Sequence, residues 1–384
     1  VQHLGFVEYL TEQFGLPASP FPDAATLDTS AAPVHARFNA NAVHGKDQVR
    51  QRMALALMEI FGGVPPGAQT PAQLVPYLRV FQQGALGNYR QLLYNITVNA
   101  AMAEAFDLRN NDKASADGAT SPNENFAREL LETFTVGPLL LNPNGTVKAG
   151  DDGEPVAAYS EKTVREFAQV FTGWTYATRQ GMTPARHNPP NYDRALVPYE
   201  ANHDVSEKVL LNAAKIRAGQ TAVQDLNAAL DNVFSHPNVG PFFAQRLIMQ
   251  LVTDSPSPAY VARVAAAFNK SGTGAGVRGD LKAVLRAVLT DQEARAGDVA
   301  GDWTIAGRET HGHWRAPNVM VPSILRGLEA QVNDTNHLAD LTAGMGQANG
   351  GLPVWAGPEQ AVGRMNGIYS LLYDDLGTGA VSYT

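Results

Sequence analysis

Apolar residues recur at intervals of three or four positions along most of the chain, which predicts a protein built largely from helices. The clearest case is residues 47–61, where Val49, Met53, Leu57 and Ile60 lie on one stripe. The same spacing predicts further helices over residues 71–83, 88–106, 123–136, 160–171, 222–235, 239–253, 258–270, 278–290, 318–331, 335–345 and 358–374. Because no repeat and no Pro/Ser-rich linker divides this pattern, it favours a single multi-helical globular domain of the all-α class.

Two segments interrupt the helical pattern. Residues 138–159 place an Asn-Pro-Asn-Gly turn, Asn142–Gly145, between two short apolar runs, which predicts a small β-hairpin insert. Residues 175–205 form the longest irregular stretch and contain four prolines. A loop of this length inside a compact domain is usually functional or mobile, so we expect a functional site to border it.

Composition and charge exclude several classes of function. The 384 residues include 29 Lys and Arg against 37 Asp and Glu, a formal net charge of −8, which argues against a general nucleic-acid binder. The absence of Cys excludes thiolate catalysis, disulfides and cysteine-ligated metal sites. No apolar run approaches the roughly 18 residues of a transmembrane helix, so we expect no transmembrane segment. The low Lys content and the Asn- and Gln-rich, Cys-free composition favour a periplasmic or extracellular location.

Several familiar catalytic signatures are missing from the sequence. It contains no GxSxG elbow, no P-loop, no HExxH motif and no dinucleotide-binding fingerprint. A serine hydrolase of the elbow type, an NTPase, a zincin and a dehydrogenase therefore have no support. No cofactor is predicted.

The helix predicted over residues 123–136 has the densest mixture of charged and apolar positions. Glu124, Arg128 and Glu132 follow at four-residue steps, so they share a face and can form ion pairs. With Glu129 beside them, they are candidates for paired carboxylates in acid–base chemistry, held by an arginine. The alternative is an ordinary ladder of surface charges.

The pair His203-Asp204 follows the long loop and precedes Lys208. A histidine beside a carboxylate can act as a base or bind a divalent metal. Asp204 can equally serve as a helix N-cap. His236-Pro237 is expected to close a loop onto the next helix.

Aromatic residues and two further histidines give weaker signals. Trp174 and Trp303 are candidates for stacking on sugars, although a buried tryptophan is the commoner case. His311 and His313 are suited to gripping a metal from a loop, but a pair without a third ligand is a weak signal.

Several longer segments together resemble a large bacterial family, the domain-of-unknown-function 1800 family. The segments that carry the resemblance are GKDQVRQRMALALMEIF (45–61), GNYRQLLYNITVNAAM (87–102), SPNENFARELLETFTVG (121–137), VREFAQVFTGWT (164–175), NHDVSEKVLL (202–211), FSHPNVGPFFAQRLIMQLVTDSPSPAYVARVAAAF (234–268) and VRGDLKAVLRAVLTDQEAR (277–295). They cover most of residues 1–295, whereas residues 296–384 match poorly. We therefore expect a family-like helical core over 1–295, with 296–384 as a divergent helical extension packed on it.

The resemblance implies a helical, exported bacterial protein, often encoded beside a sulfatase-like partner. That association suggests the cell envelope or surface glycans, but it implies no known reaction. The polar positions that match the family segments are Asn123, Glu124, Arg128, Glu129, Trp174, His203, Asp204, Lys208, His236 and Arg246. A network of charged residues buried between helices would leave the same pattern.

Three hypotheses follow from these observations. The first is a scaffold or binding protein of the envelope or extracellular surface, with a sulfatase-like protein, a glycan or a second copy of the chain as partner, and no nucleic acid. The second is an exported hydrolase of a polysaccharide or envelope polymer, with the long loop closing its cleft. Its catalytic residues would be Glu124, Glu129, His203 and Asp204, and its substrate-binding residues Asn123, Arg128, Trp174, Lys208, His236 and Arg246. The third is a metal-dependent phosphoesterase, with a divalent metal at His203 and Asp204.

Overall fold

Helices dominate the part of the chain that the structure describes, and the predicted all-α class is confirmed. The structure is a computed structural model that describes residues 5–65, 67–270, 277–296, 315–329, 331–332 and 381–382. The α-helices there are α1 (Phe6–Gly15), α2 (Ala32–His44), α3 (Gln48–Ile60), α4 (Pro71–Gly84), α5 (Tyr89–Thr97), α6 (Ala100–Ala105), α7 (Asn125–Glu129), α8 (Glu161–Val170), α9 (Ala222–Ser235), α10 (Val239–Leu251), α11 (Pro258–Asn269), α12 (Leu281–Thr290), α13 (Gln292–Arg295) and α14 (Pro317–Gly327). The helices predicted over 335–345 and 358–374, and Trp303, His311 and His313, lie outside the described residues.

Short strands and turns connect the helices. The strands pair as antiparallel ribbons: β1 (Trp174–Thr175) with β2 (Val197–Pro198), β3 (Lys208–Val209) with β4 (Lys215–Ile216), and β5 (Gln331–Val332) with β6 (Val381–Ser382). Single turns of 3-10 helix occur at Ala24–Thr26, Glu200–Asn202 and Leu211–Ala213. Among the described residues, no helix is both long enough and apolar enough to cross a membrane.

The chain divides into two compact units. The first comprises Val1–Val64, Ala68–Ala85 and His313–Thr384, and the second comprises Pro65–Gly67 and Leu86–Gly312. The first unit therefore draws on both ends of the chain. The expected boundary at residue 295 rests on sequence similarity, whereas this division rests on contacts in space.

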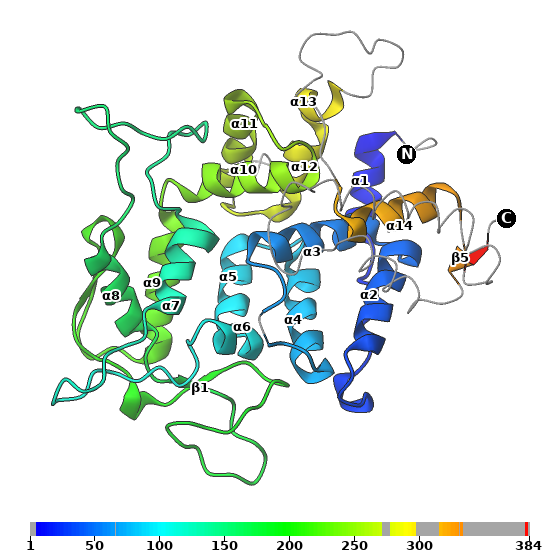
Figure 1. Cartoon of the computed structure of the whole chain (residues 1–384). Helices are drawn as coiled ribbons and strands as arrows, with labels where there is room; N and C mark the ends of the chain where they lie inside the picture. Colours follow the sequence, from blue (N-terminus) through cyan, green and yellow to red (C-terminus); the bar gives the residue numbers. More distant parts are fainter. Residues whose placement is uncertain are drawn as a thin grey trace, which may run out of the picture. The chain divides into compact units, whose positions relative to one another are not determined.

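Each unit is built by packing helices that are neighbours in space. In the first unit, α3 packs against α1 and α4, and α14 packs against α2 (Figure 1). In the second unit, α10, α11 and α12 pack in succession, and α8 contacts both α7 and α9 (Figure 1). Tyr89 is at the core of the second unit, where its ring lies 4.7 Å from that of Phe243 and 5.2 Å from that of Phe268.

Helix α8 forms as the hydrophobic pattern predicts. The Ser160 side chain accepts a hydrogen bond from the Thr163 N–H and so caps the first turn. Val164 and Phe167 are fully buried, and Phe171, directly after the helix, is 1% exposed. The amphipathic spacing thus decides which face of α8 enters the core.

The predicted helix 123–136 is present but changes its hydrogen-bond pattern halfway. After α7, residues Leu130–Thr135 form a π-helix. The Thr135 hydroxyl donates to the Leu130 carbonyl five positions earlier, and the N–H groups of Val136 and Gly137 both donate to the Leu131 carbonyl. Such π segments insert an extra residue in a turn, which the three-to-four spacing of apolar residues cannot reveal.

The predicted insert is a compact β structure held by the buried side chain of Asn238. The hairpin is confirmed by an antiparallel bridge between Leu141 and Val147. Gly145 closes its turn with a positive φ of 80°, the conformation that suits glycine. The Asn238 amide donates to the Val136 and Leu139 carbonyls, and its oxygen accepts from the Leu141 N–H.

The long loop is closed at its base and pinned internally. Strands β1 and β2 pair Trp174 with Pro198, which brings the two ends of the loop together. Within it, the Asn188 side chain is 3% exposed and donates to the Tyr176 carbonyl at 2.8 Å. The loop lacks regular secondary structure over most of its length. Hydrogen bonds between its own side chains and backbone hold its shape instead.

Candidate functional site

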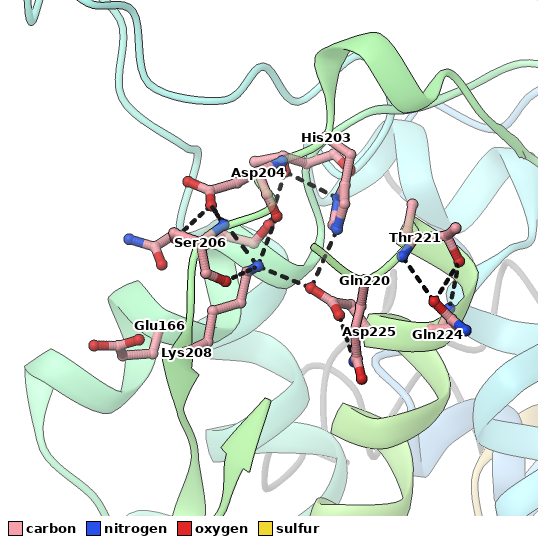
Figure 2. A network of polar contacts seen from close by, with 12 residues as sticks. Glu166, His203, Asp204, Ser206, Lys208, Gln220, Thr221, Gln224 and Asp225 are labelled. Atoms are coloured by element: carbon pink, nitrogen blue, oxygen red, sulfur yellow. Dashed lines mark hydrogen bonds and ion pairs between the residues drawn. The ribbon is translucent and has the colours of Figure 1, made fainter. Parts of the chain in front are cut away.

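The sequence-predicted pair His203-Asp204 leads into a buried polar cluster in the second unit. Figure 2 shows the His203 ring and the Lys208 side chain converging on the carboxylate of Asp225, which comes from the first turns of α9. His203 and Lys208 are fully buried, and Asp225 is 1% exposed. We call these three residues the buried triad.

The His203 ring is engaged at both nitrogens. Its Nδ1 lies 3.0 Å from the Thr172 carbonyl oxygen, which can only accept, so Nδ1 carries a proton and donates to it. Its Nε2 lies 3.2 Å from Asp225 Oδ2. Neither ring nitrogen therefore points to an open site.

The Lys208 ammonium group uses all three of its donors inside the protein. Its Nζ donates to Asp225 Oδ2 at 2.8 Å, to the Asp204 carbonyl at 2.6 Å and to the Ser206 carbonyl at 3.0 Å. A buried charge is tolerated only when it is paired and hydrogen-bonded, and this one is. The long side chain thus fastens the 203–208 segment onto α9.

Asp225 is the partner that the sequence pattern did not single out. Its other oxygen, Oδ1, accepts from the Gln220 amide at 2.9 Å. Burial raises the pKa of Asp225, but the hydrogen bonds from His203 and Lys208 lower it more, and the pKa lies below its ordinary value. In sequence, an aspartate shortly after the Thr221 N-cap has the usual appearance of a favourable first-turn charge, so nothing marked it as buried.

A glycine explains how two separate family-like segments meet at the triad. Gly173 has a φ of 80°, and a Cβ placed on it would lie 2.9 Å from the backbone nitrogen of His203. Its N–H donates to the Asn111 carbonyl, and its carbonyl accepts from the Tyr199 N–H. The FTGW segment and the His203-Asp204 segment therefore touch backbone to backbone, which leaves no room for a side chain.

Asp204 does not join His203 as a second ligand or base. Its carboxylate turns back to accept from the backbone N–H and the hydroxyl of Ser206, and its own N–H donates to the Thr172 hydroxyl. Since Thr172 and Asp225 occupy the two His203 nitrogens, the pair does not present two neighbouring metal ligands. Among the described residues, no group of three or more His, Cys, Asp or Glu side chains could hold a metal ion.

The predicted carboxylate helix forms a different cluster. Arg128 makes two hydrogen bonds with the Glu161 carboxylate of α8, at 3.0 and 2.8 Å, and one with Glu124 at 3.2 Å. The expected i,i+4 pair between Glu124 and Arg128 is therefore present, and the stronger link to Glu161 is one that the sequence did not indicate. Within the described part of the chain, no hydrogen bond or ion pair joins Glu124 or Glu129 to the buried triad. The ion pairs of Arg128 with Glu124 and Glu161 lie at the partly exposed surface, and the pair with Glu161 ties α7 to α8.

The remaining predicted residues hold the chain together. The Asn123 backbone carbonyl accepts from the Asn111 side-chain amide, and the Asn123 N–H donates to the Asn111 side-chain oxygen. His236 is 3% exposed, and its ring accepts from the Asn238 N–H, so it closes the loop onto α10 as expected. Arg246 donates to the Thr133 carbonyl of the π-helix. Trp174 is 2% exposed, so in this conformation its ring is not offered to a sugar at the surface.

A second polar cluster joins Asp112, which precedes α7, to three residues of the long loop, and no sequence pattern indicated it. Asp112 Oδ1 accepts from Arg186 Nε at 2.8 Å, from His187 Nε2 at 2.8 Å and from the Asn202 amide at 2.6 Å. The side chains of Arg186 and His187 are about half exposed. We call these four residues the loop cluster. It lies next in sequence to the buried triad, since Asn202 precedes His203.

The electrostatics of the loop cluster favour an ionised Asp112. Burial raises the pKa of Asp112, while the hydrogen bonds from Arg186, His187 and Asn202 lower it more strongly, so the pKa lies below its ordinary value. A permanent carboxylate in turn fixes the orientation of the His187 ring. Asp112 and His187 are 75 residues apart in sequence, so no local spacing could have paired them.

The chain matches one protein family over nearly its whole length. The family model is described as a protein of unknown function (DUF1800), and it matches residues 1–367. The chain belongs to this family. Comparisons with curated proteins and with solved structures gave no match.

Membership of the DUF1800 family extends the resemblance seen in the sequence. The family-like segments end at residue 295, whereas the DUF1800 match continues to residue 367. The DUF1800 match therefore takes in α14 and much of the region that the segment comparison treats as divergent. Within the second unit, three of the DUF1800-like segments, at 121–137, 164–175 and 202–211, join through Asn111, Gly173 and His203.

Proposed function

We propose that this DUF1800 protein is a helical scaffold or binding protein of the bacterial cell envelope or extracellular surface, and that it performs its role without catalysis. The observation that carries the proposal is the burial of His203, a predicted catalytic residue, together with Lys208, a predicted substrate-binding residue. His203 and Lys208 are 0% exposed, and their hydrogen bonds are all made to the protein itself. Groups used in this way stabilise a fold and cannot reach a substrate.

The arrangement of the carboxylates supports the same proposal. Acid–base hydrolysis of a glycan needs two carboxyl groups that face one bound sugar. Here Glu124 pairs with Arg128, which also pairs with Glu161, and the triad binds none of them. The exported location and the sulfatase-like partner are implied by the family resemblance and form part of this proposal.

The loop cluster supplies a surface suited to a polar polymer. Arg186 and His187 present about half of their side chains to solvent, while Asp112 holds them in fixed orientations. Pre-orientation of polar side chains lowers the conformational entropy lost on binding. We therefore assign to this surface the binding of an envelope polysaccharide.

The test separates binding from hydrolysis. The purified full chain is mixed with insoluble envelope polysaccharide, and the pellet and the soluble products are both analysed. The proposal expects retention in the pellet without released sugars, and retention that falls in the Arg186→Gln variant. Release of products by the wild type that is lost in a folded Glu124→Gln variant would overturn it in favour of the predicted carboxylate site.

One observation favours a second candidate function, a hydrolase based on the loop cluster. Asp112 holds His187 through Nε2, and His187 Nδ1 makes no hydrogen bond among the residues described. An imidazole that is oriented by a carboxylate, in a side chain about half exposed to solvent, has the arrangement of a general base. In the same assay, product release that is lost in His187→Gln but kept in Glu124→Gln would select this candidate.

A further inference from the structure

The first unit contains a pocket with both apolar and polar lining side chains that the proposed function does not use. It has a volume of about 70 Å³ and lies between α2, α3 and α14. Its polar lining residues are Gln48, Gln51, Arg52, Asn318, Ser323 and Arg326. Crevices between packed helices that combine apolar walls with a few convergent polar groups are common ligand sites.

The sequence places these side chains on matching helix faces. On α14, Asn318, Pro322 and Arg326 follow at four-residue steps and therefore share one side of the helix. On α3, Gln48, Gln51 and Arg52 share a face for the same reason. The polar side chains that line the pocket thus come from two regular helices, α3 and α14, which hold them in place.

One wall of the pocket offers a hydrogen-bond acceptor that has no partner among the described residues. Asn318 is 9% exposed, and its Oδ1 is buried with no hydrogen bond to that part of the chain. Buried acceptors are nearly always satisfied, so this wall calls for a donor from a ligand.

Positive charge reaches the pocket from both α3 and α14. Arg52 and Arg326 line it, and the Arg326 guanidinium also donates to the Val43 carbonyl. Burial and the nearby charge of Arg315 lower the pKa of Arg52 to about 10, which leaves it charged at neutral pH. Glu59 is the negative charge that acts on Arg52, and no acidic side chain is among the described residues that line the pocket. The local charge therefore favours an anion.

We infer that the pocket binds a small hydroxycarboxylate, whose carboxylate faces Arg52 and Arg326 and whose hydroxyl donates to Asn318 Oδ1. A hydroxyl is preferred over an ammonium group as the donor because the surrounding charge is positive. The volume limits the size of the ligand. If one water needs about 10–15 Å³, the pocket admits about five to seven non-hydrogen atoms, the size of glycolate or lactate.

Calorimetric titration of the full chain tests this inference with three probes: glycolate, acetate and ethylene glycol. Acetate lacks the hydroxyl, and ethylene glycol lacks the charge. We expect glycolate to bind with a millimolar dissociation constant and acetate to bind at least about fivefold more weakly, since it makes no hydrogen bond to Asn318. Ethylene glycol should give no saturable heat. Equal affinity for glycolate and acetate, or no glycolate binding, would overturn the inference.

Variants of the lining residues test whether glycolate binds in this pocket. Asn318→Leu removes the acceptor at similar volume and should weaken glycolate binding at least about tenfold, and Arg52→Gln should do the same by removing the charge. The matched control is Arg37→Gln, an exposed arginine on α2 that does not line this pocket, and it should leave affinity unchanged. Binding that Arg37→Gln weakens as much as Arg52→Gln would show that net charge, and not the pocket, attracts the ligand. If Asn318→Leu does not fold, the comparison of glycolate with acetate on the native protein still decides.

Discussion

Gly173 lies so close to the backbone of His203 that a Cβ on Gly173 would approach the His203 nitrogen to 2.9 Å and its Cα to 3.0 Å. The contact joins the end of α8 to the segment that carries the buried triad. The contact also positions the His203 backbone so that its ring reaches Asp225 on α9. The close approach and the positive φ of 80° are two separate reasons for glycine at this position.

Replacing Gly173 with alanine should therefore cost more than backbone strain alone. Gly181 provides a matched control, because it has the same φ of 80° and a Cβ on it would have no described atom within 4 Å beyond its chain neighbours. We expect Gly181→Ala to lower the free energy of unfolding by about 1 kcal/mol and Gly173→Ala by about 3 kcal/mol or more. Urea denaturation of both variants measures the difference. Equal losses would mean that the His203 segment can move away without cost.

Lys208 is predicted to be the most sensitive member of the buried triad. Lys208→Met keeps the aliphatic stem but removes the only cation among the described residues that the buried Asp225 carboxylate pairs with apart from the His203 ring, and it takes the donor from two backbone carbonyls. We expect the free energy of unfolding to fall by about 3 kcal/mol, the usual cost of stranding one partner of a buried pair. Lys215→Met is the control: Lys215 pairs with Glu207 at the exposed surface, and its loss should cost about 0.5 kcal/mol or less. Similar losses for the two variants would contradict the burial of the triad.

The pKa of Asp112 predicts a specific dependence of stability on acid. Because this pKa is lower in the folded protein than in the unfolded chain, Asp112 contributes stability above its unfolded pKa, and that contribution disappears as the pH falls through the folded value. The free energy of unfolding should therefore decline below about pH 4. Asp112→Asn should make this decline shallower, and Arg186→Gln should act in the same direction because it removes one of the hydrogen bonds that lower the pKa. Urea titrations from acid to neutral pH test this, and unchanged slopes in both variants would rule it out.

Asn238 is predicted to control the order of the insert more than the stability of the helices. Asn238→Ala removes two donors and one acceptor that hold Val136, Leu139 and Leu141. We expect a loss of about 2 kcal/mol and faster proteolytic cleavage within residues 138–157. Asn144→Ala is a control in the exposed turn of the same insert and should change cleavage less. Cleavage at the wild-type rate in Asn238→Ala would show that the insert holds itself together.

The sequence predicts the helices well because the spacing of apolar residues in each helix follows the face that is buried. The apolar spacing in residues 160–171 predicts the face of α8 that is buried, and the Asn-Gly turn predicts the hairpin bridge between Leu141 and Val147. The pattern fails at Leu130–Thr135, where a π-helix replaces the α-helix. A side-chain hydroxyl and a distant arginine, Arg246, take the carbonyls there, and neither partner affects the local hydrophobic period.

The candidate site could be predicted only in part. His203 and Lys208 could be singled out from the sequence because they are polar residues in family-like segments. Their roles depend on Asp225, which belongs to a later helix, α9. Asp112 and His187 are 75 residues apart, and α7, the β insert, α8 and the first part of the long loop lie between them in the sequence. Charge and residue type identify groups that can interact, but they do not determine which groups the chain brings within hydrogen-bond distance.

The sequence by itself determined that this chain is of the all-α class, that residues 138–159 carry a small β insert, and that it belongs to the DUF1800 family. The first two follow from the local spacing of residue types, and the third follows from similarity along the chain. Neither requires knowledge of which distant residues are in contact. Only the tertiary structure decided that His203 and Lys208 are buried and satisfied, while Arg186 and His187 face solvent. Burial depends on which distant helices pack against a residue, and that packing is set by the fold as a whole.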